Sequence, residues 1–164
     1  MKLHINDANI LIDIVKLDIV DAFLTLDFEL YTTDFVFNEL ETLQQNQLVS
    51  KKLNIIATEE IEDFDAIIKL KEEHNGLSFE DCSVWYYAKK LNGVLITGDN
   101  KLRKKVSQSG ITVKGIIFII EEIKKQNKRT ISECINLLML LKTINNRLPI
   151  NEIEIRISQW QSEL

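Results

Sequence analysis

Short apolar stretches alternate with longer stretches of helical spacing along the first two thirds of the chain. Leu3 and Ile5 alternate with polar residues, which is typical of a short strand. Apolar residues then recur at helical spacing from Ile10 to Leu17. Continued in this way, the pattern predicts further strands at 28–32, 53–57, 94–97 and 111–113, the second of which also fits an extended linker. It predicts further helices at 18–26, 35–43, 59–73, 79–91 and 100–108.

The remaining third of the chain is predicted to be helical. Ile116 to Ile120 fits either a strand or a helix, and the Glu121–Lys125 pair at i,i+4 favours a helix. Apolar positions between residues 131 and 141 mark another helix, and Pro149, the only proline, opens the last one.

Strands that alternate with helices predict an α/β fold with a mainly parallel sheet covered on both faces. No Gly-, Pro- or Ser-rich linker, repeat or low-complexity segment interrupts the pattern. We therefore expect one domain over residues 1–164, with a core at about 1–114 and added helices at about 115–164.

Two acids follow predicted strands directly. Asp7 follows the first strand, and Asp99 follows the strand at 94–97. Asp81 lies in the first turn of the helix at 79–91. In open parallel sheets, ligands bind beyond the carboxyl ends of the strands, so Asp7 and Asp99 are expected at such an edge. The helix leading into the strand lets Asp81 reach the same place.

Each of these acids also has a purely structural explanation. Asp7 and Asp99 can cap the helices that follow them, and Ser78 with Asp81 resembles a capping box. The combination is more informative, because clustered carboxylates disfavour joint ionisation unless a cation neutralises them. Mg²⁺ or Mn²⁺ takes oxygen ligands and supplies that charge. Lys101 and Arg103, shortly after Asp99, are candidates to hold phosphate groups.

Charge is distributed unevenly along the chain. The formal net charge is −5, which by itself argues against a nucleic-acid partner. Residues 1–82 carry 6 Lys or Arg and 18 Asp or Glu, a net of −12, whereas residues 83–164 carry 14 and 7, a net of +7. One surface can therefore meet an anion while acids gather elsewhere. No apolar run is long enough to cross a membrane, and two distant cysteines fit a reducing cytoplasm.

Four short motifs over residues 3–114 resemble those of PIN domains. They are Asp7-Ala-Asn9, Asn38-Glu39-Leu40, Leu77-Ser78-x-x-Asp81 and Leu95-Ile96-Thr97-Gly98-Asp99. Each is weak alone, but all four occur in the expected order and spacing. The resemblance implies a three-layer α/β/α sandwich and a metal-dependent ribonuclease.

The same resemblance implies roles for individual residues. Asp7, Glu39, Asp81 and Asp99 would hold one or two Mg²⁺ or Mn²⁺ ions, with Glu41 as the alternative to Glu39. Asn9 and Thr97 would support the site, and Lys101 and Arg103 would contact RNA phosphates. Small single-domain PIN proteins resemble VapC-type toxins, which implies a cognate antitoxin protein, a homodimer and a cytoplasmic location.

Two other functions fit the same sequence. A binding module that keeps the fold without catalysis would use its acids only as helix caps. A phosphoacceptor or phosphatase domain usually has two acids close together after its first strand, whereas this chain has Asp7-Ala-Asn9.

Overall fold

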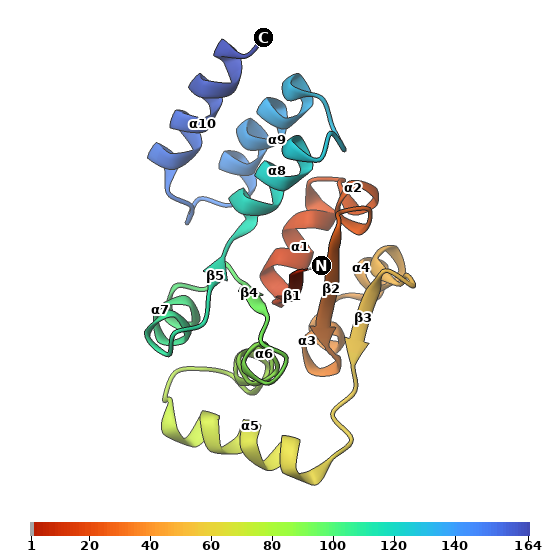
Figure 1. The fold of residues 1–164 in the computed structure, drawn as a ribbon, viewed down its shortest axis with the longest axis vertical. Coiled ribbons are helices and arrows are strands. Elements are labelled where there is room, and N and C mark those ends of the chain that lie inside the picture. Colours follow the sequence, from red (N-terminus) through yellow and green to blue (C-terminus); the bar gives the residue numbers. More distant parts are fainter. Residues whose placement is uncertain (1) are drawn as a thin grey trace.

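A five-stranded parallel sheet forms the centre of the protein (Figure 1). The computed structural model describes residues 2–164. The strands are β1 (Lys2–Asn6), β2 (Phe28–Thr33), β3 (Leu53–Ile56), β4 (Val94–Ile96) and β5 (Val113–Lys114), and they lie in the order β3-β2-β1-β4-β5. Every pairing is parallel. The predicted α/β fold with a parallel central sheet is therefore confirmed, and the pairing of β3 with β2 makes residues 53–56 a strand and not a linker.

Ten helices within residues 2–164 surround the sheet. They are α1 (Ala8–Lys16), α2 (Val20–Leu24), α3 (Asp34–Glu39), α4 (Thr42–Leu48), α5 (Ile61–Glu73), α6 (Phe79–Lys90), α7 (Asn100–Gln108), α8 (Ile116–Lys125), α9 (Ile131–Ile144) and α10 (Ile150–Ser162). Right-handed crossovers place the helices that follow β1 and β2 on one face, and those that follow β3 and β4 on the other. In agreement, α1 packs against α4, while α6 packs against β1, β2 and β4. The result is a three-layer sandwich.

Both faces of the central strands are covered, so even the polar His4 and Asn6 of β1 are buried. Ile5 in β1 and Leu95 and Ile96 in β4 have no exposed surface. Each strand ends at a polar residue on the same edge of the sheet: β1 leads into Asp7, and β4 leads into Thr97 and Asp99. The buried strands therefore fix where these polar side chains emerge.

The last three helices lie at one end of the molecule, opposite α5 (Figure 1). The helix favoured for residues 116–120 is confirmed as the start of α8, which packs against α2 and α9, and α9 in turn packs against α10. None of the helices in the described part of the chain combines the length and the apolarity that crossing a bilayer requires.

The single helix predicted at residues 35–43 is wrong. The chain leaves the helix after Glu39, because Leu40 has an extended backbone (φ −72°, ψ 147°) and buries its side chain. A separate helix, α4, begins at Thr42, and the Glu41 amide donates to Gln44 Oε1 at 2.9 Å. The prediction counted Leu43 among the apolar positions of the helix, but its side chain is 73% exposed. The last strand was also misplaced, and lies at Val113–Lys114 instead of residues 111–113.

Candidate carboxylate site

Asp7 is the most deeply buried acid at the carboxyl edge of the sheet. Its backbone amide donates to the Ile96 carbonyl at 2.9 Å, which ties the end of β1 to the end of β4. Its Oδ1 accepts from the Ala8 amide at 2.8 Å, and its Oδ2 accepts from the Thr97 hydroxyl at 2.7 Å. Only 4% of the residue is exposed. Asp7 is thus the N-cap of α1 and is also aimed at the end of β4.

Thr97 links Asp7 to Asp99. The Thr97 hydroxyl donates to Asp7 and accepts from the Asp99 amide at 3.1 Å. Asp99 in turn uses Oδ1 to accept from the Leu102 amide at 2.8 Å, as the N-cap of α7. Asn9 Oδ1 accepts from the Gly98 amide at 3.0 Å and fixes the same turn. The structure therefore joins Asp7, Asn9, Thr97 and Asp99 in one hydrogen-bonded group.

Asp81 reaches this edge from α6, where it forms a capping box with Ser78. The Ser78 amide donates to Asp81 Oδ2 at 2.9 Å, and the Asp81 amide donates to Ser78 Oγ at 3.0 Å. Glu39 comes from the last turn of α3 and is exposed. Neither residue hydrogen-bonds to the group around Thr97 within residues 2–164, so their connection to it is electrostatic.

The pKa values show that these acids share one neighbourhood. Burial first, and then the charges of Asp81 and Asp99, raise the pKa of Asp7 to about 6, while the bond from Thr97 opposes this. Burial, Asp99 and Glu80 likewise raise the pKa of Asp81. Carboxylates whose charges raise the pKa of a neighbouring acid stand close enough to disfavour joint ionisation.

Glu39 belongs to the same neighbourhood, together with an acid that the sequence pattern did not single out. Desolvation, followed by the charges of Glu80, Asp7 and Asp81, raises the pKa of Glu39 to about 7. Glu80 was missed, although its position directly before Asp81 was a usable signal.

No basic side chain neutralises these acids within residues 2–164. Lys and Arg make ion pairs elsewhere, but no Lys, Arg or His of the described residues pairs with Asp7, Glu39, Asp81 or Asp99. The site therefore presents negative charge that a bound cation is able to balance.

The two predicted phosphate contacts, Lys101 and Arg103, approach different segments of the chain. Lys101 extends toward the loop before α6, where a Cβ placed on Gly76 would lie 3.6 Å from Lys101 Nζ. Arg103 donates from Nη2 to the Thr97 carbonyl at 2.9 Å, so its guanidinium is held at the end of β4.

The donor chemistry of the site fits a hard divalent cation. All the candidate ligands are carboxylates, and the hydrogen bonds of Asp81 and Asp99 described above engage one oxygen of each, which leaves the other for a ligand. In this arrangement, however, no three Asp, Glu, His or Cys side chains of the described residues are close enough to surround one ion. The fit is one of donor type and charge, not of a closed coordination sphere.

Fold and site together define an α/β sandwich with clustered acids at the carboxyl edge of a parallel sheet. The family model DUF3368, which is described as a PIN domain, matches residues 3–162. The chain therefore belongs to the PIN-domain family, as the motifs predicted. PIN domains are typically nucleases, so membership indicates a hydrolase that acts on nucleic acid. No curated protein matches the chain.

Proposed function

We propose that this protein is a divalent-metal-dependent endoribonuclease. The observation that carries the proposal is the group of carboxylates at the carboxyl edge of the sheet, which has no basic partner within residues 2–164. After burial, the charges of neighbouring acids in this group help to raise the pKa values of Asp7, Glu39 and Asp81. Such a group is costly unless a cation accompanies it. Family membership supports a nuclease, and the four motifs support RNA as its substrate.

In this proposal Asp7, Glu39, Asp81 and Asp99 hold Mg²⁺ or Mn²⁺. An ion held by these carboxylates would supply a water of lowered pKa and positive charge to offset that on the leaving oxygen of the phosphodiester. Thr97 orients the Asp7 carboxylate through its 2.7 Å bond.

Three further residues support the carboxylate site in this proposal. Asn9 holds the turn that presents Asp99. Lys101 and Arg103 contact phosphates of the RNA strand on either side of the cleaved bond.

Cleavage of a labelled single-stranded RNA by the purified protein tests the proposal. Cleavage is expected with Mn²⁺ or Mg²⁺ and not with EDTA, and Asp99→Asn should abolish it while the far-ultraviolet circular dichroism spectrum stays unchanged. Unchanged cleavage by Asp99→Asn, after a nuclease-free preparation is verified, would overturn the assignment.

A matched pair of variants tests the role of Glu39. Glu39→Gln should lower cleavage by at least about a hundredfold, within the range typical of removing a residue that acts in the transition state. Glu41→Gln should leave cleavage within about twofold, because Glu41 is the N-cap of α4 and is not among the acids whose charges raise the pKa of Glu39. Equal losses in both variants would remove Glu39 from the proposed ligands.

A binding module without catalysis is the competing function, and calorimetry separates the two. The nuclease requires measurable Mn²⁺ binding that Asp7→Asn weakens. No heat of binding at millimolar Mn²⁺ would favour the module.

For its biological setting we propose a toxin that a cognate antitoxin protein silences, acting as a homodimer in the cytoplasm. This rests on the resemblance of the motifs to small single-domain toxins. Growth arrest on expression, relieved by co-expression of a small neighbouring gene, is the expected result. Normal growth at high expression of the active protein would contradict it.

A further inference from the structure

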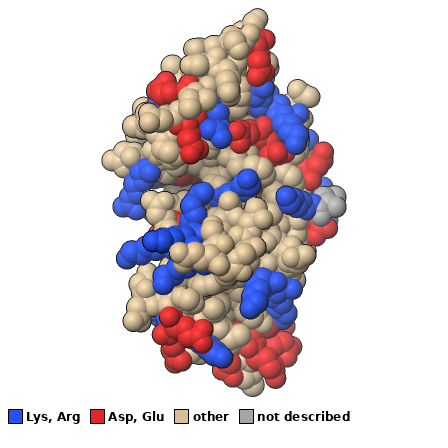
Figure 2. Space-filling model, turned by 60° about the vertical axis from the view of Figure 1, so that its left-hand side comes forward, with Lys and Arg blue, Asp and Glu red and all other residues tan. Residues whose placement is uncertain are grey.

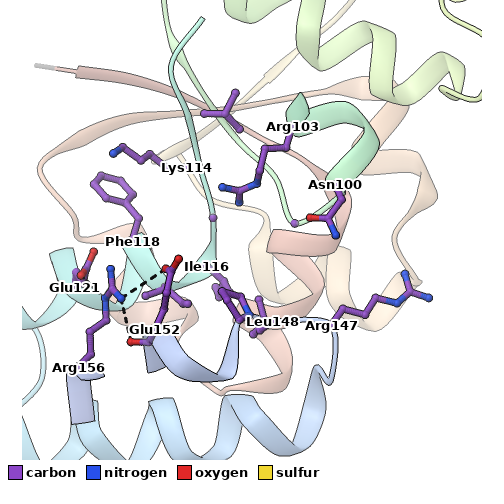
Figure 3. A pocket seen from close by; sticks show the side chains of 15 residues that line it. Asn100, Arg103, Lys114, Ile116, Phe118, Glu121, Arg147, Leu148, Glu152 and Arg156 are labelled. Carbon is purple, nitrogen blue, oxygen red and sulfur yellow. Dashed lines mark hydrogen bonds and ion pairs between the residues drawn. The ribbon is translucent and has the colours of Figure 1, made fainter. Parts of the chain in front are cut away.

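A cavity of about 520 Å³ lies between the nuclease-like core and the C-terminal helices (Figure 3). Its wall comes from α7, β5, α8 and the start of α10, together with the loop that precedes α10. The volume lies within the ~300–1,000 Å³ typical of pockets that take small ligands. Because α8, α10 and the loop before α10 supply much of the wall, the cavity gives the C-terminal part of the chain a role beyond packing.

The cavity carries more positive than negative charge. Four basic side chains line it, Arg103, Lys114, Arg147 and Arg156, against two acids, Glu121 and Glu152. Figure 2 shows Lys and Arg gathered across the middle of the neighbouring face, with Asp and Glu above and below them. The cavity therefore favours an anionic ligand.

The basic side chains of the cavity differ in how far they are already engaged. Arg156 lies between the two acids: its Nε donates to Glu121 at 2.5 Å, and its Nη1 is 3.7 Å from Glu152 Oε2 (Figure 3). Lys114 and Arg147 are exposed and make no ion pair within residues 2–164. These two cations are therefore available to a ligand.

The cavity opens directly beside the carboxylate site. Gly98 and Asn100, on either side of Asp99, both line it. Arg103 connects the two sites, since its guanidinium donates to the Thr97 carbonyl while it also lines the cavity. A chain molecule that places one phosphate at Asp99 can thus place its next unit in the cavity.

Much of the rest of the lining is apolar, which favours a nucleotide over an acidic peptide. Ile116, Ile117, Leu148 and Phe118 contribute to the wall, and Lys114 Nζ lies 5.8 Å from the centre of the Phe118 ring. A nucleotide combines an anionic phosphate with a flat, weakly polar base, and bases pack on aromatic and apolar side chains. A Glu- or Asp-rich peptide would use the cations but would leave the apolar wall without a partner.

We propose that this cavity binds the nucleotide of a single-stranded RNA that adjoins the cleaved phosphodiester, with Lys114 and Arg147 contacting its phosphates. This deepens the proposed ribonuclease activity, and rests on it for the identity of the ligand. A pocket that takes a single base beside the scissile bond requires an unpaired strand, because a base within a duplex is not free to enter it.

Fluorescence anisotropy tests the proposal with a labelled single-stranded RNA of about 12 nucleotides and the full-length Asp99→Asn protein. Lys114→Ala/Arg147→Ala should raise Kd at least tenfold. The slope of log Kd against log salt should fall by about 1.4, at ~0.7 for each lost phosphate contact to a single strand. Lys51→Ala/Lys52→Ala is the matched control: it removes the same charge at the amino end of β3, on the opposite edge of the sheet, and should change Kd by less than twofold.

The outcomes separate the cavity from the proposed activity. Equal Kd values for the two double variants, with both folded by circular dichroism, would overturn the cavity assignment even if the wild-type protein cleaves RNA. Loss of binding in Lys114→Ala/Arg147→Ala alone supports the cavity, even if the wild-type protein with Mn²⁺ cleaves nothing and the proposed activity fails. If poly-glutamate displaces the labelled RNA as well as unlabelled RNA of equal charge does, the nucleotide assignment is overturned in favour of an acidic protein partner.

Discussion

Replacing Asp7 with Asn should stabilise the metal-free protein at pH 8 while it abolishes cleavage. Burial and the nearby acids raise the pKa of Asp7 to about 6, from an ordinary value of 3.8. The folded protein therefore holds this proton to a higher pH than the unfolded chain does. Its stabilising effect is complete below pH ~4 and is lost as the pH rises through about 6.

The size of the effect follows from the same two pKa values. A difference of about 2 units at ~1.36 kcal/mol per unit makes the ionised Asp7 unfavourable by about 3 kcal/mol at pH 8. Asn removes this charge but has one acceptor oxygen, whereas Asp7 accepts from both Ala8 and Thr97. Losing one of these bonds costs about 1 kcal/mol. The expected net gain is about 2 kcal/mol at pH 8, turning into a loss of about 1 kcal/mol at pH 4.

Urea unfolding in EDTA at pH 8 and pH 4 measures both values. Asp21→Asn is a control of opposite sign, because a hydrogen bond from Arg129 lowers the pKa of Asp21, and removing its charge should slightly destabilise the protein at pH 8. The reasoning is refuted if Asp7→Asn is less stable than wild type at pH 8, or if its effect is the same at both pH values.

Three other substitutions test separate parts of the structure. Thr97→Val removes the hydroxyl whose hydrogen bond lowers the pKa of Asp7. The acid limb of the pH–rate profile should therefore move up by about one pH unit, as expected for the loss of a charge-assisted hydrogen bond, and an unmoved limb contradicts this. Gly115→Ala places a Cβ 2.6 Å from Arg103 Nη2, so it should displace the guanidinium and weaken RNA binding several-fold, with little change in melting temperature. His4 is fully buried, and neither ring nitrogen has a partner in the described structure. Burial, and then the charge of Lys2, lowers the pKa of His4 to about 4, so the neutral imidazole contributes stability above pH 6.5 that is lost as the pH falls through 4. In urea unfolding, His4→Phe should remove this pH dependence and raise the free energy of unfolding by about 1 kcal/mol at pH 8.

The strands and the acids that follow them were predictable because local and tertiary signals agree there. β4 is a short apolar run that is buried on both faces, whereas β1 alternates Leu3 and Ile5 with polar residues, and in both cases the acid that follows the strand marks the edge of the sheet. Asp99 and Asp81 also fit helix caps, and both turned out to be caps. A helix cap and a metal ligand are compatible roles for one carboxylate, since a cap engages one oxygen and leaves the other for a ligand.

The end of α3 was not predictable, because tertiary packing decides it. Apolar residues at 37, 40 and 43 continue a helical spacing, yet Leu40 is buried in an extended conformation and Leu43 is exposed. That break places Glu39 in the last turn of a short helix, near Glu80. The local sequence around Glu39 or Glu80 does not predict that the two lie close together, since they meet only when α3 packs on α6.

The charge asymmetry of the sequence takes on a spatial meaning in the strand order. The acidic half of the chain supplies Asp7, Glu39 and Asp81, and the basic half supplies the cations of the cavity. β4 lies between β1 and β5, so the turn after it faces the acids on one side and the cavity on the other. In that turn, the Thr97 hydroxyl donates to Asp7 and the Thr97 carbonyl accepts from Arg103. A strand order with β4 at the edge would separate the two charges, whereas this order lets one polyanion contact a metal-binding site and a basic cavity at once.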